Sequence, residues 1–274
     1  MNEPVNDIEL RLLLEALYLR YHYDFRGYAR SSLRRRLRVA MDKFGCDTLS
    51  RLQERLLHDA TLMQELMDIL TVQVSEMFRD PPYFQALREQ VVPLLRTYPS
   101  LKVWVAGCST GEEVYSLAIL LKEEGLLERS FIYATDINAQ ALEKAQAGVY
   151  DIERISGFTR NHRKSGGRGS LSTYYTAAYG KAVFDRSLKA HITFADHSLS
   201  TDAAFSEVQL VSCRNVLIYF DRALQDRAVG LFRDSLCYKG FLGIGSSESL
   251  RFSSHVDSFA ELDREDRIYQ KVAA

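Results

Sequence analysis

Cysteine and proline are scarce in this sequence. Its 274 residues include four cysteines and five prolines. The cysteines form neither a CxxC pair nor the spacing of a metal site, and the histidines show no ligand spacing, so we expect no metal. Isolated cysteines are typical of reduced thiols, which predicts a cytoplasmic protein. These cysteines are Cys46, Cys108, Cys213 and Cys237.

An excess of one charge and long apolar runs are also absent. Lys and Arg number 35, Asp and Glu 36, and the formal net charge is −1. This balance argues against a protein-wide basic surface, so we expect no nucleic-acid partner. No apolar run approaches the roughly 18 residues of a membrane span, and the N-terminus lacks the apolar stretch of a signal peptide, so we expect no membrane insertion. The hydrophobic fraction of 46% is that of an ordinary globular protein.

The first part of the chain has helical periodicity. From residue 7 to about residue 83, apolar side chains recur at helix spacing. Gly45 is placed to end a helix, and Thr48 is placed to cap the next one. We therefore predict an all-helical domain over residues 1–80. Pro81 and Pro82 then open a linker, residues 81–100, with a helix from Tyr83 to about residue 95.

Strand-like and helical segments alternate from residue 101 onward. This alternation predicts a mostly parallel sheet with helices on both faces, over residues 101–274. The last two strands, 258–262 and 268–272, would be antiparallel around a charged turn. The other expected strands are 102–106, 131–135, 192–195, 208–213 and 241–245, and the expected helices are 112–124, 139–147 and 221–236.

One stretch interrupts the alternation. Residues 158–189 are basic, glycine-rich and aromatic. We predict a small β-hairpin insertion at about 155–190 with a flexible tip near residues 161–169. The tip could bind a partner or be a disordered loop, and the composition favours neither.

The clearest chemical signal is the segment GCSTGEE, residues 107–113, between a buried strand and a helix. Gly107 would let the backbone approach a ligand, but the spacing is not GxGxxG. Glu112 and Glu113 at the mouth of the helix would repel a pyrophosphate and favour a cation. Asp136 ends the next strand, where a carboxylate can accept both hydroxyls of a ribose. This combination points to S-adenosylmethionine, although a tight strand–helix turn with capping acids is the simpler alternative.

Four segments resemble the chemotaxis receptor glutamate methyltransferases, the CheR family. Residues 107–116 match the family's glycine loop, except that Val114 replaces a proline. Residues 134–137 match its ribose-binding strand end, 213–220 its specific CRNVLIYF signature, and 245–250 the loop that follows. Two departures are Gln73 and Ser75 between the domains, in place of asparagine and threonine. A third is Ser198, in place of a cofactor-binding asparagine.

The resemblance implies a Rossmann-like α/β methyltransferase domain with a mostly parallel sheet, an antiparallel last strand and a small β-subdomain insertion, preceded by an all-α domain. It implies methyl transfer from S-adenosylmethionine to glutamate side chains of a chemoreceptor's cytoplasmic domain, with S-adenosylhomocysteine as product. Arg79 and Tyr219 would be catalytic. The cofactor would contact Gln73, Ser75, Arg79, Gly107, Glu112, Asp136, Ser198, Leu199, Arg214 and Asn215.

A glutamate carboxylate, with an ordinary pKa of about 4.3, is already a nucleophile at pH 7, so the reaction requires no nucleophile–base pair. Positioning and exclusion of water would supply much of the rate. An arginine fork could hold the incoming carboxylate, and Arg79 is the first candidate.

Five arginines fall in one expected helix whose Leu33 and Leu37 would face the domain core. They leave an arginine-rich outer face that could bind phosphate, bind an acidic helix or be merely solvated. We favour an acidic helical substrate, as the resemblance implies. The five are Arg30, Arg34, Arg35, Arg36 and Arg38.

Other functions remain open at this point. The same chemistry could act on an acidic signalling protein outside chemotaxis, or the chain could be a non-catalytic module that binds S-adenosylmethionine. A nicotinamide dehydrogenase is the weakest alternative, because the glycine spacing is wrong and the two acids oppose a pyrophosphate. Nothing in the sequence requires an oligomer, and we expect a monomer.

Overall fold

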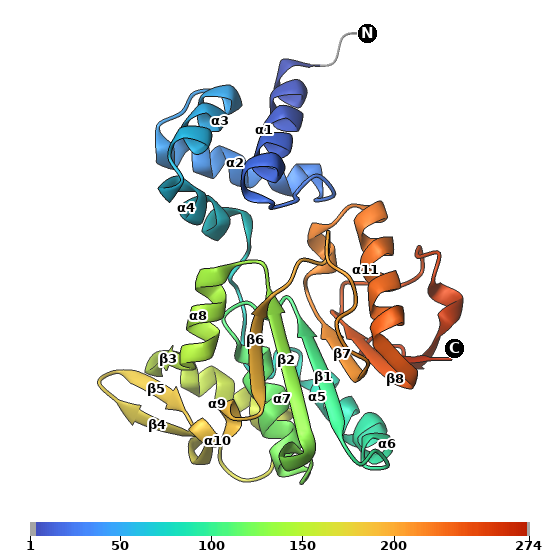
Figure 1. Cartoon of the computed structure of the whole chain (residues 1–274). Coiled ribbons are helices and arrows are strands. Elements are labelled where there is room, and N and C mark those ends of the chain that lie inside the picture. Colours follow the sequence, from blue (N-terminus) through green and yellow to red (C-terminus); the bar gives the residue numbers. More distant parts are fainter. Residues whose placement is uncertain (1–3, 273–274) are drawn as a thin grey trace.

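The computed structural model describes residues 4–272. Figure 1 shows a small group of helices above a larger domain built on a twisted sheet. The helical group consists of α1 (Val5–Tyr21), α2 (Arg30–Phe44), α3 (Leu49–His58) and α4 (Thr61–Leu70). Gly45 ends α2 in a left-handed conformation, and the Thr48 side chain accepts a hydrogen bond from Arg51 N at the start of α3. Both helix ends lie where the sequence predicts them.

The linker forms one nearly continuous helix. It runs through α5 (Pro81–Ala86), a wider turn η1 (Leu87–Val91) and α6 (Val92–Leu95). The two prolines occupy the first turn, where their missing N–H groups leave no helical hydrogen bond unmade, so the helix begins earlier than expected. The wide turn precedes Pro93, which cannot donate to a carbonyl in the previous turn.

A seven-stranded sheet forms the larger domain, in the order β6-β2-β1-β7-β8-β10-β9. Neighbouring strands are parallel from β6 to β8, whereas β10 is antiparallel to both β8 and β9. The predicted mostly parallel sheet with an antiparallel last strand is therefore confirmed. The strands are β1 (Leu101–Ala106), β2 (Ser130–Asp136), β6 (Ile192–Asp196), β7 (Val208–Cys213), β8 (Leu236–Ile244), β9 (Phe259–Asp263) and β10 (Ile268–Lys271).

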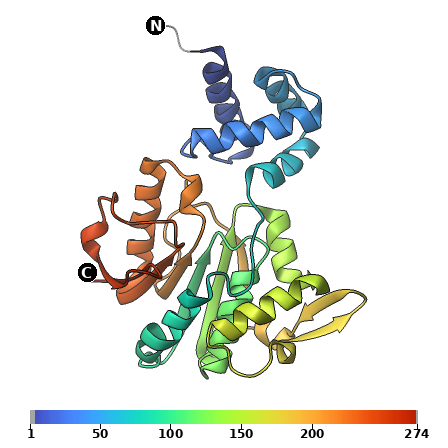
Figure 2. The same ribbon diagram turned by 180° about the vertical axis from the view of Figure 1, so that it is seen from behind.

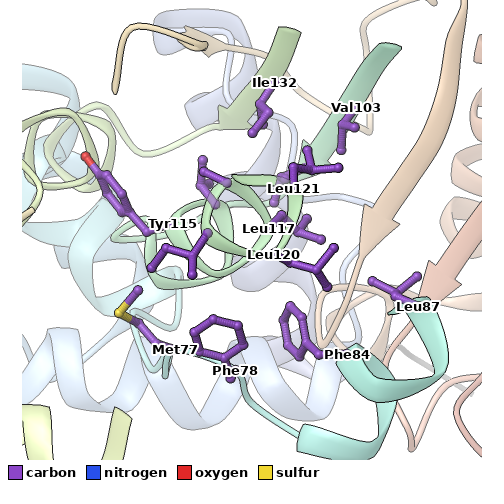
Figure 3. Close-up of a cluster of buried hydrophobic side chains, with 14 of the residues drawn as sticks. Met77, Phe78, Phe84, Leu87, Val103, Tyr115, Leu117, Leu120, Leu121 and Ile132 are labelled. Carbon is purple, nitrogen blue, oxygen red and sulfur yellow. The ribbon is translucent and has the colours of Figure 1, made fainter. Parts of the chain in front are cut away.

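Helices cover both faces of this sheet (Figure 2). On one face, α7 (Glu112–Glu123) lies between the sheet and the linker helix, and α8 (Ala139–Ala147) lies beside it. Figure 3 shows Leu117, Leu120 and Leu121 of α7 between strand residues on one side and residues 78–87 on the other. On the opposite face, α11 (Arg222–Ser235) packs Phe232 against Trp104 of β1. The core thus fixes the ends of β1, β2 and β7.

The insertion contains more helix than the sequence predicts. Residues 155–164 form α9 (Ile155–Lys164), which buries Ile155, Phe158 and His162 at helical spacing. The glycine-rich segment after it is anchored, because Arg88 Nε donates to Ser165 O at 3.1 Å. The expected flexible tip is thus the end of a helix, and the basic, glycine-rich composition hid the apolar face of that helix. A three-stranded antiparallel sheet joins β3 (Val149–Asp151), β5 (Lys181–Phe184) and β4 (Tyr175–Ala178).

The turn of the β4–β5 hairpin is Tyr179-Gly180, whose φ angles of 49° and 73° are those of a tight two-residue turn. Within residues 4–272, no helix has the length and apolar character needed to cross a membrane. The remaining short helices are α10 (Arg186–Lys189), η2 (Leu127–Arg129), η3 (Ile152–Arg154), η4 (Leu171–Tyr174), η5 (Leu217–Tyr219) and η6 (Val256–Ser258).

Candidate functional site

A cavity lies at the carboxyl ends of β6, β2, β1 and β7, beneath the N-terminal helices. Its empty space is about 940 Å³ including the open mouth. The strand order reverses at β1, which is where ligands bind in open α/β sheets. The residues around it are Tyr28, Arg36, Leu70–Ser75, Arg79, Val105–Ser109, Glu113, Asp136, Ile137, His197, Leu199, Arg214–Val216, Tyr219 and Phe220.

The glycine loop forms the floor of this cavity. Gly107 has a φ of +71°, and a Cβ atom there would lie 2.5 Å from Val216 Cγ2. Its N–H and that of Cys108 both donate to Thr135 O, at 2.8 and 2.9 Å. The loop after β1 is therefore held against the end of β2. Only glycine fits at position 107, where this loop comes closest to Val216 in the loop after β7.

Asp136 is held at the end of β2 by backbone groups. Its Oδ2 accepts from Ser109 N at 2.8 Å, and its Oδ1 accepts from Asn138 N at 2.9 Å. Burial raises the pKa of this carboxyl, the backbone donors oppose that shift, and the nearby Asp196 adds to it. Since each carboxylate oxygen accepts more than one hydrogen bond, Asp136 has capacity left for a diol.

The two acids of the α7 N-terminus point to different places. Glu112 is fully buried, accepts from Thr110 Oγ1 at 2.6 Å and pairs with Arg154 at 2.7 Å. It is not among the residues around the cavity, whereas Glu113 is. The structure therefore turns Glu113, and not Glu112, toward the cavity, and the cofactor contact of Glu112 stays a prediction. Adjacent helix residues point about 100° apart, so only one of the two can face the ligand.

Arg214 borders the cavity and is held there by several partners. Its side chain is 1% exposed and pairs with Asp80 at 2.8 Å and Glu113 at 3.1 Å. Its guanidinium also lies 4.1 Å from the centre of the Tyr83 ring. Arg79 lines the cavity and has a looser contact, a 3.4 Å hydrogen bond from its guanidinium to Val74 O. Of these two arginines, Arg79 is the one able to respond to a ligand.

A buried acid that sequence reasoning missed supports the loop after β7. Glu248 Oε2 accepts from Asn215 N at 3.1 Å, and Oε1 accepts from Ile218 N at 3.2 Å. Asn215 has a φ of +60°, so this contact holds a strained backbone. Burial raises the pKa of Glu248, and the backbone donors oppose that rise. The sequence signal that could have identified Glu248 was its place in the family segment 245–250. That segment by itself did not indicate what the residue does.

The segment between the domains reaches the glycine loop. Gln73 Oε1 accepts from Ser109 Oγ at 2.6 Å, and Ser75 also borders the cavity. Ser198 does not border it, and its hydroxyl pairs with Ser200 Oγ at 2.8 Å. The predicted cofactor contact of Ser198 stays a prediction. Its neighbours His197 and Leu199 border the cavity instead.

Arg36 enters the cavity from the N-terminal domain. Its side chain follows Leu33 and Leu37 inward, and the residue is 7% exposed. The guanidinium lies 4.6 Å from the centre of the Tyr219 ring and donates to Leu70 O. Its second terminal nitrogen, Nη2, is buried with no partner among residues 4–272. The prediction that Arg36 belongs to the outer face is wrong, since the helix turns this position toward the larger domain.

The other four arginines of α2 are exposed, as predicted for an outer face. Arg34 forms an ion pair with Asp7 of α1. They do not border the cavity, and they are Arg30, Arg34, Arg35 and Arg38. Residues 4–272 also contain no group of three or more histidine, cysteine, aspartate or glutamate side chains able to hold a metal ion.

Both parts of the chain match models of one protein family. Residues 8–71 match the all-alpha domain of CheR methyltransferases, and residues 73–267 match their S-adenosylmethionine-binding domain. The chain is 58% identical to the putative methyltransferase Cher3 of Pseudomonas putida, over 98% of this chain and 99% of that protein. It is 33% identical to a chemotaxis protein methyltransferase of Listeria innocua, over 83% and 84% of the two chains. These matches confirm the resemblance seen in the sequence.

Proposed function

Because the chain belongs to the CheR family of S-adenosylmethionine-dependent methyltransferases, we propose that it methylates glutamate side chains on the cytoplasmic domain of a chemoreceptor. One observation carries the choice of a carboxylate as acceptor. Arg36 brings a buried guanidinium with an unpaired nitrogen to the Tyr219 ring, inside the cavity that would hold the cofactor. This guanidinium contacts Leu70 O and the Tyr219 ring but has no carboxylate partner among the described residues, and an incoming carboxylate would supply one.

The residues present fit S-adenosylmethionine. We assign the ribose hydroxyls to Asp136 and the close backbone approach to Gly107, where any larger residue would strike Val216. Gln73, Ser75, Leu199 and Asn215 complete the proposed cofactor contacts, with Glu113 in place of Glu112 as the nearby acid. When bound, the cofactor would supply an electron-poor methyl group on a sulfonium. The carboxylates of Asp136 and Glu113 favour such a cation.

The chemistry requires little from the protein beyond positioning. A glutamate side chain is ionised at neutral pH, so its oxygen can take the methyl group without a general base. Arg36 and Arg79 would hold the carboxylate from two sides, and Tyr219 would flank the line of attack. Two arginine forks would orient the nucleophile, and the N-terminal domain above the cavity would limit the access of water.

The exposed arginines of α2 would select the protein that carries the glutamate. Arg30, Arg34, Arg35 and Arg38 lie on the solvent side of the helix that sends Arg36 inward. An acidic helix docked on this face would place one of its glutamates near the cavity mouth. Electrostatic complementarity of this kind acts mainly on encounter and specificity. We propose a cytoplasmic, monomeric enzyme acting on such a helix.

The test is methylation of purified chemoreceptor cytoplasmic fragments with labelled S-adenosylmethionine. Base-labile methyl esters on glutamates are expected. In Arg36→Met, kcat/KM should fall about 10- to 100-fold, the value of a lost charge-assisted contact. Arg35→Met removes an exposed neighbour and should raise KM modestly without changing kcat. Absence of esters on every fragment would refute the receptor assignment, and an unchanged kcat/KM in Arg36→Met would refute the role of Arg36.

A further inference from the structure

The segment that joins the two domains has no regular structure of its own. Residues 71–80 lie between α4 and α5 and belong to no helix or strand. This inter-domain segment nevertheless lines the cavity, at Gln73, Ser75 and Arg79 among others. Within the described residues 4–272, no backbone–backbone hydrogen bond involves residues 72–79. Side chains from elsewhere in the fold must therefore hold this backbone in place.

The insertion after β3 supplies part of that support. Asn161 Nδ2 of α9 donates to Met77 O at 3.1 Å. The next residue, His162, packs its ring against Phe78 with the ring centres 4.9 Å apart. Figure 3 shows the side chains of Met77 and Phe78 on the other side, against α7. The second half of the inter-domain segment is thus packed between α7 and α9.

Arg154 of the insertion holds the part of the segment that borders the cavity. It ends the short helix η3, and its Nη2 donates to Ser75 O at 2.5 Å. Its Nη1 pairs with Glu112, the buried acid at the start of α7, at 2.7 Å. The guanidinium also lies 4.9 Å from the centre of the Phe158 ring. One side chain therefore joins the insertion, the first turn of α7 and the inter-domain segment.

A guanidinium suits this place because of its shape and charge. Its donors form a rigid planar fork, so two nitrogens can bind two acceptors at a fixed spacing. Glu112 is itself fixed, since it is fully buried and also accepts from Thr110 Oγ1 at 2.6 Å. Hydrogen bonds from a charged donor are roughly twice as strong as neutral ones. The position of α7 is thereby passed on to the Ser75 carbonyl.

We propose that Arg154 is a positioning residue for methyl transfer. By bridging Glu112 and Ser75 O, it holds the inter-domain segment in the conformation that lines the cavity. Arg154 is not among the residues around the cavity, so it acts through the segment and not on a ligand. The proposal rests on the proposed cofactor contacts of this segment, and not on the glutamate substrate. Binding measurements without any acceptor protein can therefore test it.

The test is titration calorimetry with S-adenosylhomocysteine. Arg154→Met should weaken binding by about tenfold or more, because the ligand must then order the segment without a charge-assisted hydrogen bond. The number of binding sites per chain should stay the same. A variant that is merely partly unfolded would instead lose sites and keep the affinity of those that remain. That result, or an unchanged affinity, would overturn the proposal.

Two controls accompany this measurement. Arg160→Met removes an exposed arginine from α9 of the same insertion and should bind like the wild type. An equal loss of affinity in Arg160→Met would assign the effect to the charge of the insertion and overturn the role of Arg154. Wild-type protein that did not bind at all would refute the proposed cofactor site itself, which is a different failure.

A double-mutant cycle separates the Ser75 contact from the ion pair. Glu112→Gln keeps the length of the side chain and an acceptor oxygen but removes the buried charge. If Arg154 acts through Ser75, adding Arg154→Met to Glu112→Gln should still lower the affinity at least about fivefold. If the loss disappears in that background, the unpaired charge of Glu112 is its cause, and the proposal is wrong.

Discussion

Several residues other than glycine adopt left-handed backbone beside the cavity. Phe78, Asp80, Ser109 and Asn215 have φ angles of 52°, 53°, 50° and 60°. Neighbouring side chains hold some of these conformations: Ser116 Oγ accepts from Phe78 N at 2.8 Å, and Asp136 accepts from Ser109 N. Strain of this kind persists only where surrounding contacts enforce it, and it concentrates at functional sites. Here the contacts come from residues far apart in the sequence.

At the scale of a single residue, we expect Gly107→Ala to abolish tight cofactor binding. The new Cβ would lie 2.5 Å from Val216 Cγ2 at a φ of +71°. Strain and the clash together should lower the free energy of unfolding by about 3 kcal/mol and the affinity for S-adenosylhomocysteine by more than about tenfold. Urea unfolding and calorimetry measure the two effects.

Gly125 offers a matched control for that change. It has nearly the same φ, +70°, but nothing lies within 4 Å of the Cβ that alanine would add. Gly125→Ala should cost only the left-handed strain, about 1–2 kcal/mol, with affinity unchanged. If both variants lost affinity equally, the close approach to Val216 would not be the cause.

At the scale of an element, α7 connects the cavity to the linker helix. Its first turn carries Glu113, and its C-terminal end forms ion pairs with an arginine of the linker. Arg88, whose side chain is 7% exposed, pairs with Glu123 and, at 3.0 Å, with Glu124. The side chains of these two acids are 2% and 4% exposed. The pairing fixes α7 against the wide turn of the linker and thereby positions the glycine loop.

We predict that Arg88→Met destabilises the fold by about 3 kcal/mol, because two buried carboxylates lose this cation and keep only Arg96, Arg168 and His162 as partners. Chemical denaturation provides the measurement. Arg51→Met is the comparison, since Arg51 and Asp47 form an ion pair with 68% and 66% of their side chains exposed. That variant should change stability by less than about 1 kcal/mol. Equal losses of stability in the two variants would show that the buried ion pairs contribute no more than an exposed ion pair.

At the scale of the whole molecule, the cavity is shared by both domains. Tyr28 and Arg36 come from the helical domain, and Ala29 N donates to Tyr219 O at 2.8 Å across the boundary. Asn138 Nδ2 donates to Asp68 and Thr71, at 3.0 and 2.9 Å. A ligand that fills the cavity would therefore contact both domains and stabilise their association.

Amide hydrogen exchange should reveal this coupling. With saturating S-adenosylhomocysteine, exchange should slow in residues 28–40 and 66–75 as well as in the loops after β1 and β2, because ligand binding lowers the population of opened states. The far ends of α1 and α3 serve as internal controls and should change little. Protection confined to residues 101–274 would mean that the helical domain does not close the cavity.

Much of this architecture could be predicted from the sequence. Apolar periodicity and capping residues such as Thr48 are local signals, so the helices and strands fall near their expected positions. The segment around Gly107 and the segment 213–220 are each continuous in the sequence, so the family and its cofactor could be recognised without knowledge of the fold. The helix at 155–164 was missed because it is basic and a glycine-rich segment follows it. Its buried positions nevertheless follow helical spacing.

Which side chains reach the cavity was decided by the tertiary structure alone. Periodicity places Arg36 on a helix beside Leu33 and Leu37, but only the packing of the two domains turns it onto the ring of Tyr219. The same holds for Glu113 over Glu112, because Ser212 of β7 donates to Glu113, and for His197 over Ser198 at the edge of the cavity. Local sequence determines backbone elements because their hydrogen bonds are local. The orientation and charge state of a side chain depend on neighbours that only folding brings together.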